Sequence, residues 1–387
     1  MCDDIGVPVG VSWATKSGGV RASEVTEALN AIVSRLLSPL TLRGTTFRNR
    51  IWVSPMCQYS SVDGHPTDWH LVHLGAFARG GAALVFTEAT AVTPEGRISP
   101  VDAGIWTDAQ AHDYRRITAF IKGQGAVPGI QLAHAGRKAS VSPPWVGGGM
   151  VPAVDGGWQP VGPSPVAFGD HAVPKELTVG EIQHLVEAWA RAAQRAVTAG
   201  FEVAEIHAAH GYLLHEFLSP LSNHRADGYG GDLAGRSRLL IEVVDAVRAV
   251  WPDDRPLFVR VSAFEWVEGG LTVDDVAEVA TTLKTHGVDL IDVSSGGNSP
   301  DQQIVLGPGY QVPFARTIRE RSELPVGAVG VITEPAQAEA VLADASADAI
   351  FLARALLREP SWPQRAAYEL GGDVYWAPQY ERARPRP

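Results

Sequence analysis

Eight short apolar runs, each bounded by turn residues, constrain the fold of this 387-residue chain more than any other feature. Segments with helical periodicity lie between most of the runs, for example 109–125, 181–200, 236–250, 273–287 and 334–345. Eight strands that alternate with helices predict an α/β fold, a (β/α)8 TIM barrel. The predicted strands are IWVSPMC (51–57), AALVFTEA (82–89), VPGIQLA (127–133), VAEIHAA (203–209), LFVRVSA (257–263), LIDVSSG (290–296), VGAVGVI (326–332) and AIFLARA (349–355).

The edges of the predicted helices agree with this fold. Thr178 and Thr272 precede first turns that carry acidic residues, and Gly200 and Gly287 follow helical runs, where glycine commonly ends a helix. The rival fold, a doubly wound sheet with a dinucleotide domain, requires GxGxxG after the first strand, and no such sequence follows Cys57. The pattern therefore favours one barrel domain over residues 36–387, including a C-terminal tail.

Two regions lie outside the repeat of strands and helices. Residues 1–35 are an N-terminal extension, within which 21–37 is compatible with a short helix. Residues 139–177, rich in Pro, Gly and Trp, form a long excursion after the third strand. Because long loops in compact domains usually serve function, we expect the excursion to cover the active face.

Composition narrows the classes of partner. The net charge is −11 and the chain has no long basic run, so we expect neither nucleic acid nor an anionic membrane as a partner. No apolar stretch approaches the roughly 18 residues that span a bilayer, and the start is acidic, which predicts a cytoplasmic protein. Only Cys2 and Cys57 occur, which argues against a disulfide framework and against a cluster held by four cysteines. Small molecules are the expected ligands.

Polar residues end many of the apolar runs. In a TIM barrel the carboxyl ends of the strands form the active site, so we expect these residues to converge there. They are Cys57, Tyr59, Glu88, Gln131, His134, His207, His210, Arg260, Ser294, Ser295 and Arg354.

Arg260 and Arg354 are the cations of this set. An arginine inside a barrel strand is costly unless it meets an anion, and a bound ligand or a core carboxylate, Glu205 or Asp292, would each serve Arg260. Arg354 follows the eighth strand, and the loops after strands seven and eight of such barrels commonly bind phosphate. The glycines of GAVGVIT supply bare backbone amides for the same site.

The stretch EIHAAHGYLLHEFLSP (205–220) admits a metal site, an acid/base site or a polar piece of core. The metal reading is weak, because HExxH is absent and Gly211 indicates a tight turn directly after His210. Two imidazoles aimed at one point suit a carbonyl or nitro oxygen that gains negative charge, and Tyr212 would then be the proton donor. We expect His215 and Glu205 to have structural roles.

Together, several motifs resemble the Old Yellow Enzyme family of flavin-dependent ene-reductases. The resemblance runs in order from about residue 36 to 382, and the SPMC cysteine and the QYERARP ending are similar to the thermophilic-like, or class III, branch. The motifs are SPMCQYSS (54–61), FTEATAVTPEGRIS (86–99), GIQLAHAGRKAS (129–140), IHAAHGYLLHEFLSPLSNHRADGYGG (206–231), VRVSA (259–263), GAVGVIT (327–333) and LARALLREP (352–360).

The resemblance implies non-covalent FMN, with NADPH or NADH as reductant and an activated alkene as substrate at one shared site. Enones, enals, maleimides and nitroalkenes are the implied substrates. His207 and His210 would hold the substrate oxygen, Tyr212 would donate the proton, and Tyr59 would add a hydrogen bond to the substrate. The residues implied to contact FMN are Ser54, Pro55, Met56, Cys57, whose thiol would tune the flavin potential, Ala89, Gln131, Arg260, Gly330, Ala353 and Arg354.

In this branch an arginine near the C-terminus reaches the neighbouring subunit's active site, and Arg382 matches it. A homodimer or a dimer-based homotetramer is therefore implied, although this chain continues as ARPRP where relatives end in ERGW. The N-terminal extension is a second difference between this chain and the family. Three alternatives stay open: a multidomain dienoyl-CoA or amine-oxidising relative, a flavin- or ligand-binding barrel without turnover, and a metal-dependent barrel hydrolase.

Overall fold

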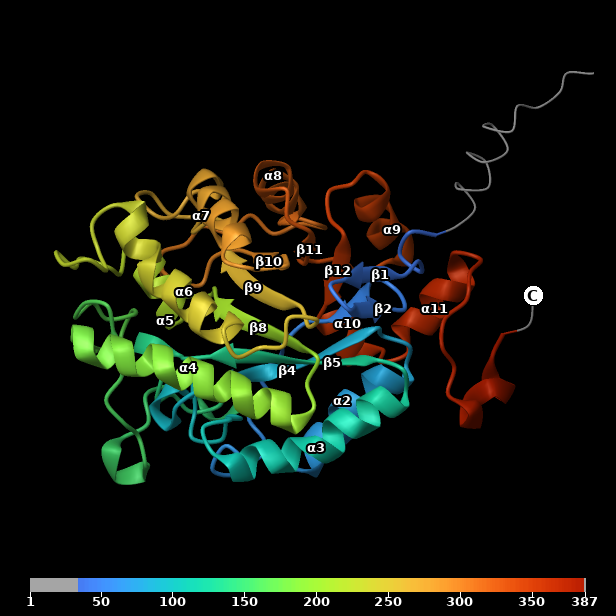
Figure 1. Ribbon diagram of the computed structural model, residues 1–387, viewed down its shortest axis with the longest axis horizontal. Coiled ribbons are helices and arrows are strands. Elements are labelled where there is room, and N and C mark those ends of the chain that lie inside the picture. The colour runs from blue at the N-terminus through green and yellow to red at the C-terminus, as the bar shows by residue number, and fades with distance from the viewer. Residues whose placement is uncertain (1–33, 386–387) are drawn as a thin grey trace, which may run out of the picture.

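The computed structural model describes residues 34–385, which form a barrel of eight parallel strands inside a ring of helices (Figure 1). The strands close in the order β10-β11-β12-β3-β4-β5-β8-β9, so every neighbour along the chain is a neighbour in the barrel. This confirms the predicted TIM barrel. The barrel strands are β3 (Ile51–Val53), β4 (Leu84–Ala91), β5 (Val127–Ala133), β8 (Val203–Ala208), β9 (Leu257–Ser262), β10 (Leu290–Ser294), β11 (Val326–Ala328) and β12 (Ala349–Leu352).

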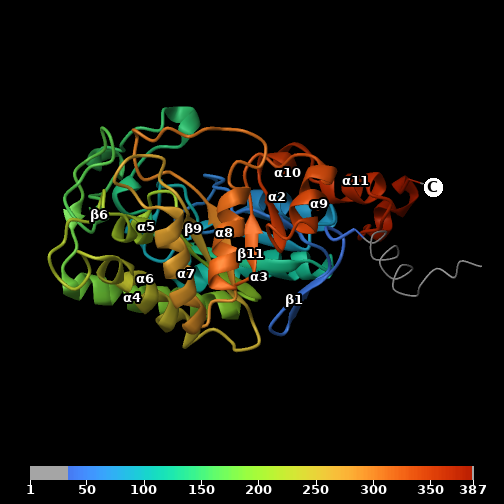
Figure 2. The same cartoon turned by 90° about the horizontal axis from the view of Figure 1, so that it is seen from above.

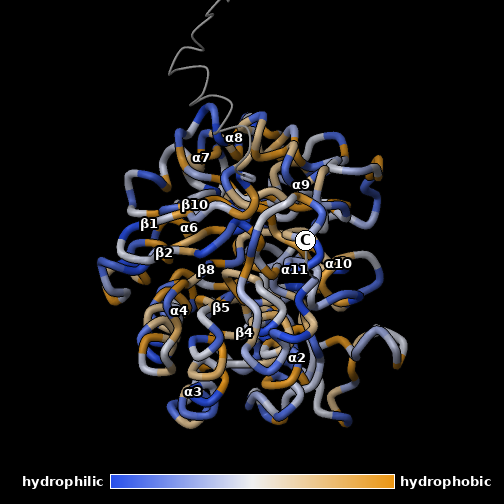
Figure 3. Tube along the Cα trace, turned by 90° about the vertical axis from the view of Figure 1, so that its right-hand side faces the viewer, coloured by the Kyte–Doolittle hydropathy of each residue, from blue (hydrophilic) through white to orange (hydrophobic). Residues whose placement is uncertain are grey.

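The helices lie outside the strands, and hydrophobic and hydrophilic stretches alternate along the outer ones (Figure 3). Such alternation is expected of a helix that buries one face against a sheet. The capping residues predicted for α4 and α7 are confirmed, because Thr178 accepts from Glu181 N and Thr272 accepts from Asp275 N. The helices are α2 (Asp68–Arg79), α3 (Asp108–Gly123), α4 (Val179–Ala199), α5 (Leu213–Leu218), α6 (Leu233–Arg248), α7 (Val273–Thr285), α8 (Val312–Ser322), α9 (Pro335–Ala343), α10 (Arg354–Arg358) and α11 (Trp362–Glu369).

Six predicted strands end earlier than the apolar runs suggested, three of them by three residues or more. β11 stops at Ala328, because Gly330 and Val331 turn the chain with φ of 120° and 51°. β12 stops at Leu352, since α10 begins at Arg354, and β3 stops at Val53. The polar residues after these strands therefore lie outside the strands, on turns, loops and the start of α10.

Two apolar layers fill the molecule. The larger packs the outer faces of the strands against the helices, and the smaller fills the barrel with rings such as Trp52, Phe86, Phe258 and Phe351. A hairpin of β1 (Leu40–Leu42) and β2 (Thr45–Phe47) adds Phe47 to the inner layer. Since the inner layer contains the first residues of several strands, the amino-terminal end of the barrel is closed and the carboxyl end remains for ligands.

The excursion at 139–177 lies at the carboxyl ends of the strands, where β6 contacts α5 (Figure 2). The ring of Trp145 meets that of Tyr59 edge-on, with 5.4 Å between centroids. This position agrees with the predicted cover. Its elements are η3 (Pro144–Val146), η4 (Ala153–Asp155), β6 (Val161–Gly162) and β7 (Lys175–Glu176); the other 3-10 turns of the chain are η1 (Pro94–Gly96), η2 (Gly136–Lys138) and η5 (Pro378–Ala383).

Most of the short helix considered for 21–37 falls outside the described residues, and 34–37 form a turn. Leu36 is buried in the core, and its backbone N–H donates to Glu339 in α9. Within residues 34–385, no helix is long and apolar enough to cross a membrane.

Candidate active site at the carboxyl ends of the strands

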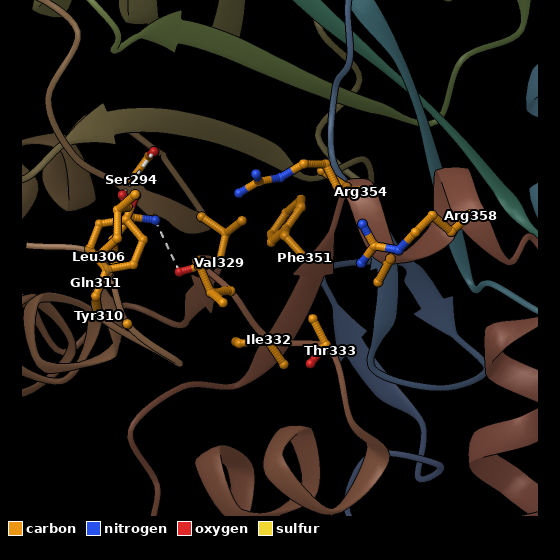
Figure 4. Close-up of a pocket in the computed structure, with 15 residues that line it drawn as sticks. Ser294, Leu306, Tyr310, Gln311, Val329, Ile332, Thr333, Phe351, Arg354 and Arg358 are labelled. Atoms are coloured by element: carbon orange, nitrogen blue, oxygen red, sulfur yellow. Dashed lines mark hydrogen bonds between the residues drawn. The ribbon is translucent and has the colours of Figure 1, made fainter. Parts of the chain in front are cut away.

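A cavity of about 570 Å³ opens beside the ends of β10, β11 and β12. Gly330, Ala353 and Arg354, which the sequence placed at a phosphate site, all line it. Figure 4 shows the Arg354 side chain in this cavity together with Ser294 and Gln311. The walls therefore combine a cation with a glycine-containing turn and several polar side chains.

Gln311 fixes the wall formed by β10 and the turn after β11. Its Nε2 donates to Val329 O at 3.0 Å, and its Oε1 accepts from Ser295 Oγ at 2.7 Å. A Cβ at Gly330 would lie 2.7 Å from Gln311 Nε2, so the Gln311 side chain would have to shift, and the φ of 120° at Gly330 favours glycine in its own right. The sequence analysis missed Gln311, which lies at the start of α8 rather than at the end of a strand.

His207, near the end of β8, lies together with His210 and Tyr212, which come just after that strand. The ring of His207 is 5.2 Å from that of His210 and 5.1 Å from that of Tyr212. His210 Nε2 is 2.7 Å from the oxygen of Ser294, which also lines the cavity. The three side chains that the sequence singled out are thus brought to one place beside the cavity.

The turn between the two histidines and the tyrosine is tightly held. His210 and Gly211 have φ of 58° and 74°, and a Cβ at Gly211 would meet Gly297 O at 2.2 Å. Lys138 Nζ donates to both His210 O and Gly297 O at 3.0 Å, and so ties this turn to the loop after β10. The sequence analysis missed Lys138, although the GRK triplet after the third predicted strand was a signal.

Burial decides the protonation states here. It lowers the pKa of His207 and His210 well below the usual value, with the Arg260 charge as the next cause, so both imidazoles are neutral near pH 7. Burial also raises the pKa of Tyr212 well above its usual value, so the phenol keeps its proton. His207 Nδ1 is buried without a hydrogen-bond partner among the described residues.

A buried polar layer lies inside the barrel below the histidines. In the register of the sheet, Arg260 of β9 lies beside His207 of β8 and beside Asp292 of β10. Its side chain forms an ion pair with Asp292, with 3.0 Å between Nε and Oδ2. Of the partners considered for Arg260, a core carboxylate is thus present, and it is Asp292. Gln131 Nε2 donates to Glu205 Oε1 at 2.7 Å, so Glu205 supports the neighbouring strand, as predicted.

His215 and Glu216 of α5 are structural, which agrees with the sequence analysis for His215. His215 is fully buried, its Nδ1 accepts from Gly211 N at 2.8 Å, and its Nε2 faces Glu265 Oε1 at 3.2 Å. Glu216 Oε1 accepts from Arg137 N at 2.8 Å. The hydrogen bond from Gly211 N to His215 holds the turn that follows His210.

The loop after β3 supplies the remaining predicted residues. Cys57, Ala89 and Tyr212 belong to one apolar cluster, and Met56 packs against the main core. Ser54 N donates to Leu352 O of β12, while the Ser54 hydroxyl is buried without a partner among the described residues. Burial, followed by the charges of Asp102 and Glu88, raises the pKa of the Cys57 thiol well above its usual value.

Arg382 does not line the cavity of its own chain. It lies in η5, exposed, at the outer end of the molecule near the C-terminus (Figure 1). No group of three or more histidine, cysteine or acidic side chains within residues 34–385 is arranged to hold a metal ion.

Comparisons with known proteins agree with this geometry. Residues 35–372 match the NADH:flavin oxidoreductase / NADH oxidase family. An NADPH dehydrogenase of Geobacillus sp. (strain WCH70) is 49% identical over 350 residues, covering 90% of this chain and 98% of that protein.

Two solved structures are similar as well. An old yellow enzyme homologue from Zymomonas mobilis aligns with a TM-score of 0.72 and 27% identity over 91% of this chain and 99% of that one. A 2-naphthoyl-CoA reductase aligns with a TM-score of 0.79 and 24% identity over 88% of this chain. This chain spans 53% of that reductase, so the second likeness shows a shared barrel only.

The residues present fit FMN. The cavity offers the Arg354 cation and a turn with φ of 120° at Gly330, where the bare backbone is open to a phosphate group. The Ser54 hydroxyl, His207 Nδ1 and Glu205 Oε2 are buried polar atoms without partners in residues 34–385, as expected beside a polar ring system. The chain belongs to the NADH:flavin oxidoreductase / NADH oxidase family, the Old Yellow Enzyme family, and is an NAD(P)H-dependent flavin oxidoreductase with FMN as its cofactor.

Proposed function

We propose that the enzyme reduces the C=C bond of activated alkenes: α,β-unsaturated ketones and aldehydes, maleimides and nitroalkenes. The observation that carries this proposal is the cluster of His207, His210 and Tyr212, whose rings lie 5.1 to 5.2 Å apart beside the cavity. Two donors next to an acid suit a substrate with an electron-withdrawing oxygen and a carbon that must be protonated.

His207 and His210 bind the carbonyl or nitro oxygen. Both imidazoles are neutral, so each has one N–H to donate and keeps no positive charge that would require a counterion in the buried site. As negative charge develops on the oxygen, these hydrogen bonds strengthen, which lowers the barrier. Tyr59, on the loop opposite, adds a hydrogen bond to the substrate.

Tyr212 donates the proton to the α-carbon. FMN bound at this site would supply the hydride, taken from NAD(P)H, that the β-carbon of the alkene accepts. The pKa of Tyr212 is raised by burial, so the proton is retained until a carbanion-like carbon, a much stronger base than phenolate, forms beside it. The Tyr212 backbone N–H donates to Ala209 O, which sets the ring close to His207.

For the cofactor we propose the contacts that the family resemblance implies. Arg354, Ala353 and Gly330 hold the phosphate, and Arg260 stabilises negative charge on the reduced ring. Cys57, with a thiol that stays protonated, tunes the flavin potential. Further contacts to the ring come from Ser54, Pro55, Met56, Ala89 and Gln131.

At the level of the assembly, we propose a cytoplasmic homodimer, or a homotetramer built from such dimers. The exposed position of Arg382 supports this proposal, because a residue that serves a neighbouring site must lie on the outside of its own chain. Residues 1–35 remain assigned as an extension and 36–387 as one FMN-binding barrel.

The alkene proposal is tested by reducing the purified holoenzyme with NADPH without oxygen and then adding cyclohexenone, a maleimide or a nitroalkene. We expect the flavin absorbance to return as saturated product forms. A flavin that none of these compounds reoxidises would contradict the proposal and would favour a barrel that binds flavin without this turnover.

A further inference from the structure

The loop that carries Cys57 and Tyr59 has a strained backbone. Tyr59 has φ of 50°, in the left-handed region that a bulky residue rarely adopts without support. The side chain of Gln58 gives part of that support, because Nε2 donates to Met56 O at 2.9 Å and Oε1 accepts from Trp69 Nε1 at 3.0 Å. The backbone N–H of Gln58 makes a separate hydrogen bond to a residue of β4.

That backbone N–H donates to Glu88. The distance from Gln58 N to Glu88 Oε2 is 2.8 Å, and Glu88 is only 3% exposed. Glu88 lies at an irregularity in β4, where the register shifts between Phe86 and Ala89 and one extra residue is accommodated. Bulges near active sites re-aim side chains. Here Glu88 reaches the backbone of the loop while the next residue, Ala89, packs in the cluster that contains Cys57.

His70 is hydrogen-bonded to the second oxygen of the Glu88 carboxylate. His70 Nε2 lies 2.8 Å from Glu88 Oε1, and the ring is 3% exposed. His70 Nδ1 accepts a hydrogen bond from Thr67 N at 2.9 Å. The ring proton is therefore on Nε2, which donates a hydrogen bond to Glu88. A continuous set of buried hydrogen bonds therefore links the start of α2, through His70 and Glu88, to the loop of Cys57 and Tyr59.

We infer that Glu88 and His70 are positioning residues, which hold Cys57 and Tyr59 in the geometry needed for tuning the flavin and for binding the alkene. This inference rests on the proposed function of those two residues. Each carboxylate oxygen of Glu88 receives one donor. A glutamine there has a single acceptor oxygen for two donors, so Glu88→Gln must release either the loop or His70. The Glu88 charge is also among the causes that raise the pKa of the Cys57 thiol.

The test uses FMN-loaded Glu88→Gln and His70→Gln proteins, with His112→Gln as the control. The side chain of His112 is 72% exposed on α3. We expect both variants to keep FMN, to shift its midpoint potential as Cys57→Ala does, and to raise KM for cyclohexenone more than they lower kcat. A change in KM on the order of tenfold is expected, below the hundredfold that a 1 Å displacement can cause. The control should match the wild type.

A double-mutant cycle separates positioning from a general loss of stability. In a Cys57→Ala, Tyr59→Phe background, Glu88→Gln should change neither the potential nor KM further. Full additivity in that background, or wild-type values in both single variants, would overturn the inference. If Cys57→Ala and Tyr59→Phe themselves change nothing, the roles proposed for those residues fail instead. His70→Gln keeps the test decisive should Glu88→Gln not fold.

Discussion

At the scale of single residues, burial separates the roles of the polar side chains in 205–216. His207 and His210 are neutral and lie beside the cavity, whereas Glu216 is completely buried, with Arg137 N as its hydrogen-bond donor. The sequence identified the residue types, and the tight turn at Gly211 was also readable from it. The pairing of Arg260 with Asp292 rather than Glu205 was not, because it depends on the register between β9 and β10.

Glu216 gives a pH dependence of stability. Burial raises the pKa of Glu216 to about 8, against an ordinary value of 4.5. The native state therefore holds a proton that the unfolded state has lost between these two pH values, so this residue makes stability fall as pH rises from 4.5 to 8. Relative to Glu216→Gln, which cannot ionise, the wild type should lose up to several kcal/mol across this range, at about 1.4 kcal/mol per pKa unit.

Urea unfolding of both proteins at pH 5 and pH 8 measures this difference. Glu187→Gln, at an exposed position of α4, serves as the control and should track the wild type at both values. Equal pH slopes for the wild type and Glu216→Gln would mean that Glu216 ionises normally in the folded protein.

At the scale of elements, the eight strands and their order were predictable because every strand is short, apolar and flanked by turns. The residues at which the strands end were less predictable. The run VGAVGVI reads as one strand, but the positive φ at Gly330 and Val331 turns the chain after Ala328. The β4 irregularity at Glu88 was equally hidden, since a bulge has no apolar signature. Val329, Gly330 and Val331 of the turn after β11 line the cavity.

The turn after β11 carries a prediction for cofactor affinity. Gly330 has φ of 120°, and an added Cβ would meet Gln311 Nε2 at 2.7 Å, so Gly330→Ala must distort the cavity wall. Strain of this kind costs about 1 to 3 kcal/mol, and we expect FMN to bind roughly tenfold or more weakly. Flavin fluorescence titration of the apoprotein gives the Kd. Gly371→Ala, also at positive φ but with open space around it, should bind FMN normally. Unchanged affinity in Gly330→Ala would remove this turn from the phosphate site.

At the scale of the whole molecule, one barrel is proposed to serve the reductant and the alkene in turn, which explains why no separate nucleotide-binding domain is needed. Arg382 lies exposed in η5 and does not line the cavity of its own chain. The family resemblance implies that a second subunit uses this residue, and its exposed position supports that proposal. The test must therefore be made on mixed dimers.

Mixed dimers distinguish an arginine that acts within its own chain from one that acts in the partner. Arg382→Ala should raise KM for cyclohexenone by roughly tenfold, the usual effect of losing one charged contact. Mixing it with His207→Ala, His210→Ala chains, which keep Arg382, should restore the native KM in the mixed dimers. Arg384→Ala is the control, because Arg384 pairs with Asp373 of its own chain. Failure of the mixture to restore KM would place Arg382 outside the partner's site.

The central claim, that Tyr212 protonates an alkene held by His207 and His210, is tested most directly by stopped-flow measurement of the two half-reactions in Tyr212→Phe. Phenylalanine keeps the ring that packs against His207 and removes the hydroxyl group that supplies the proton. We expect reduction of the flavin by NADPH at the wild-type rate and reoxidation by cyclohexenone slowed by about 10² to 10⁴, the usual contribution of a general acid. Reoxidation at the wild-type rate would contradict the account.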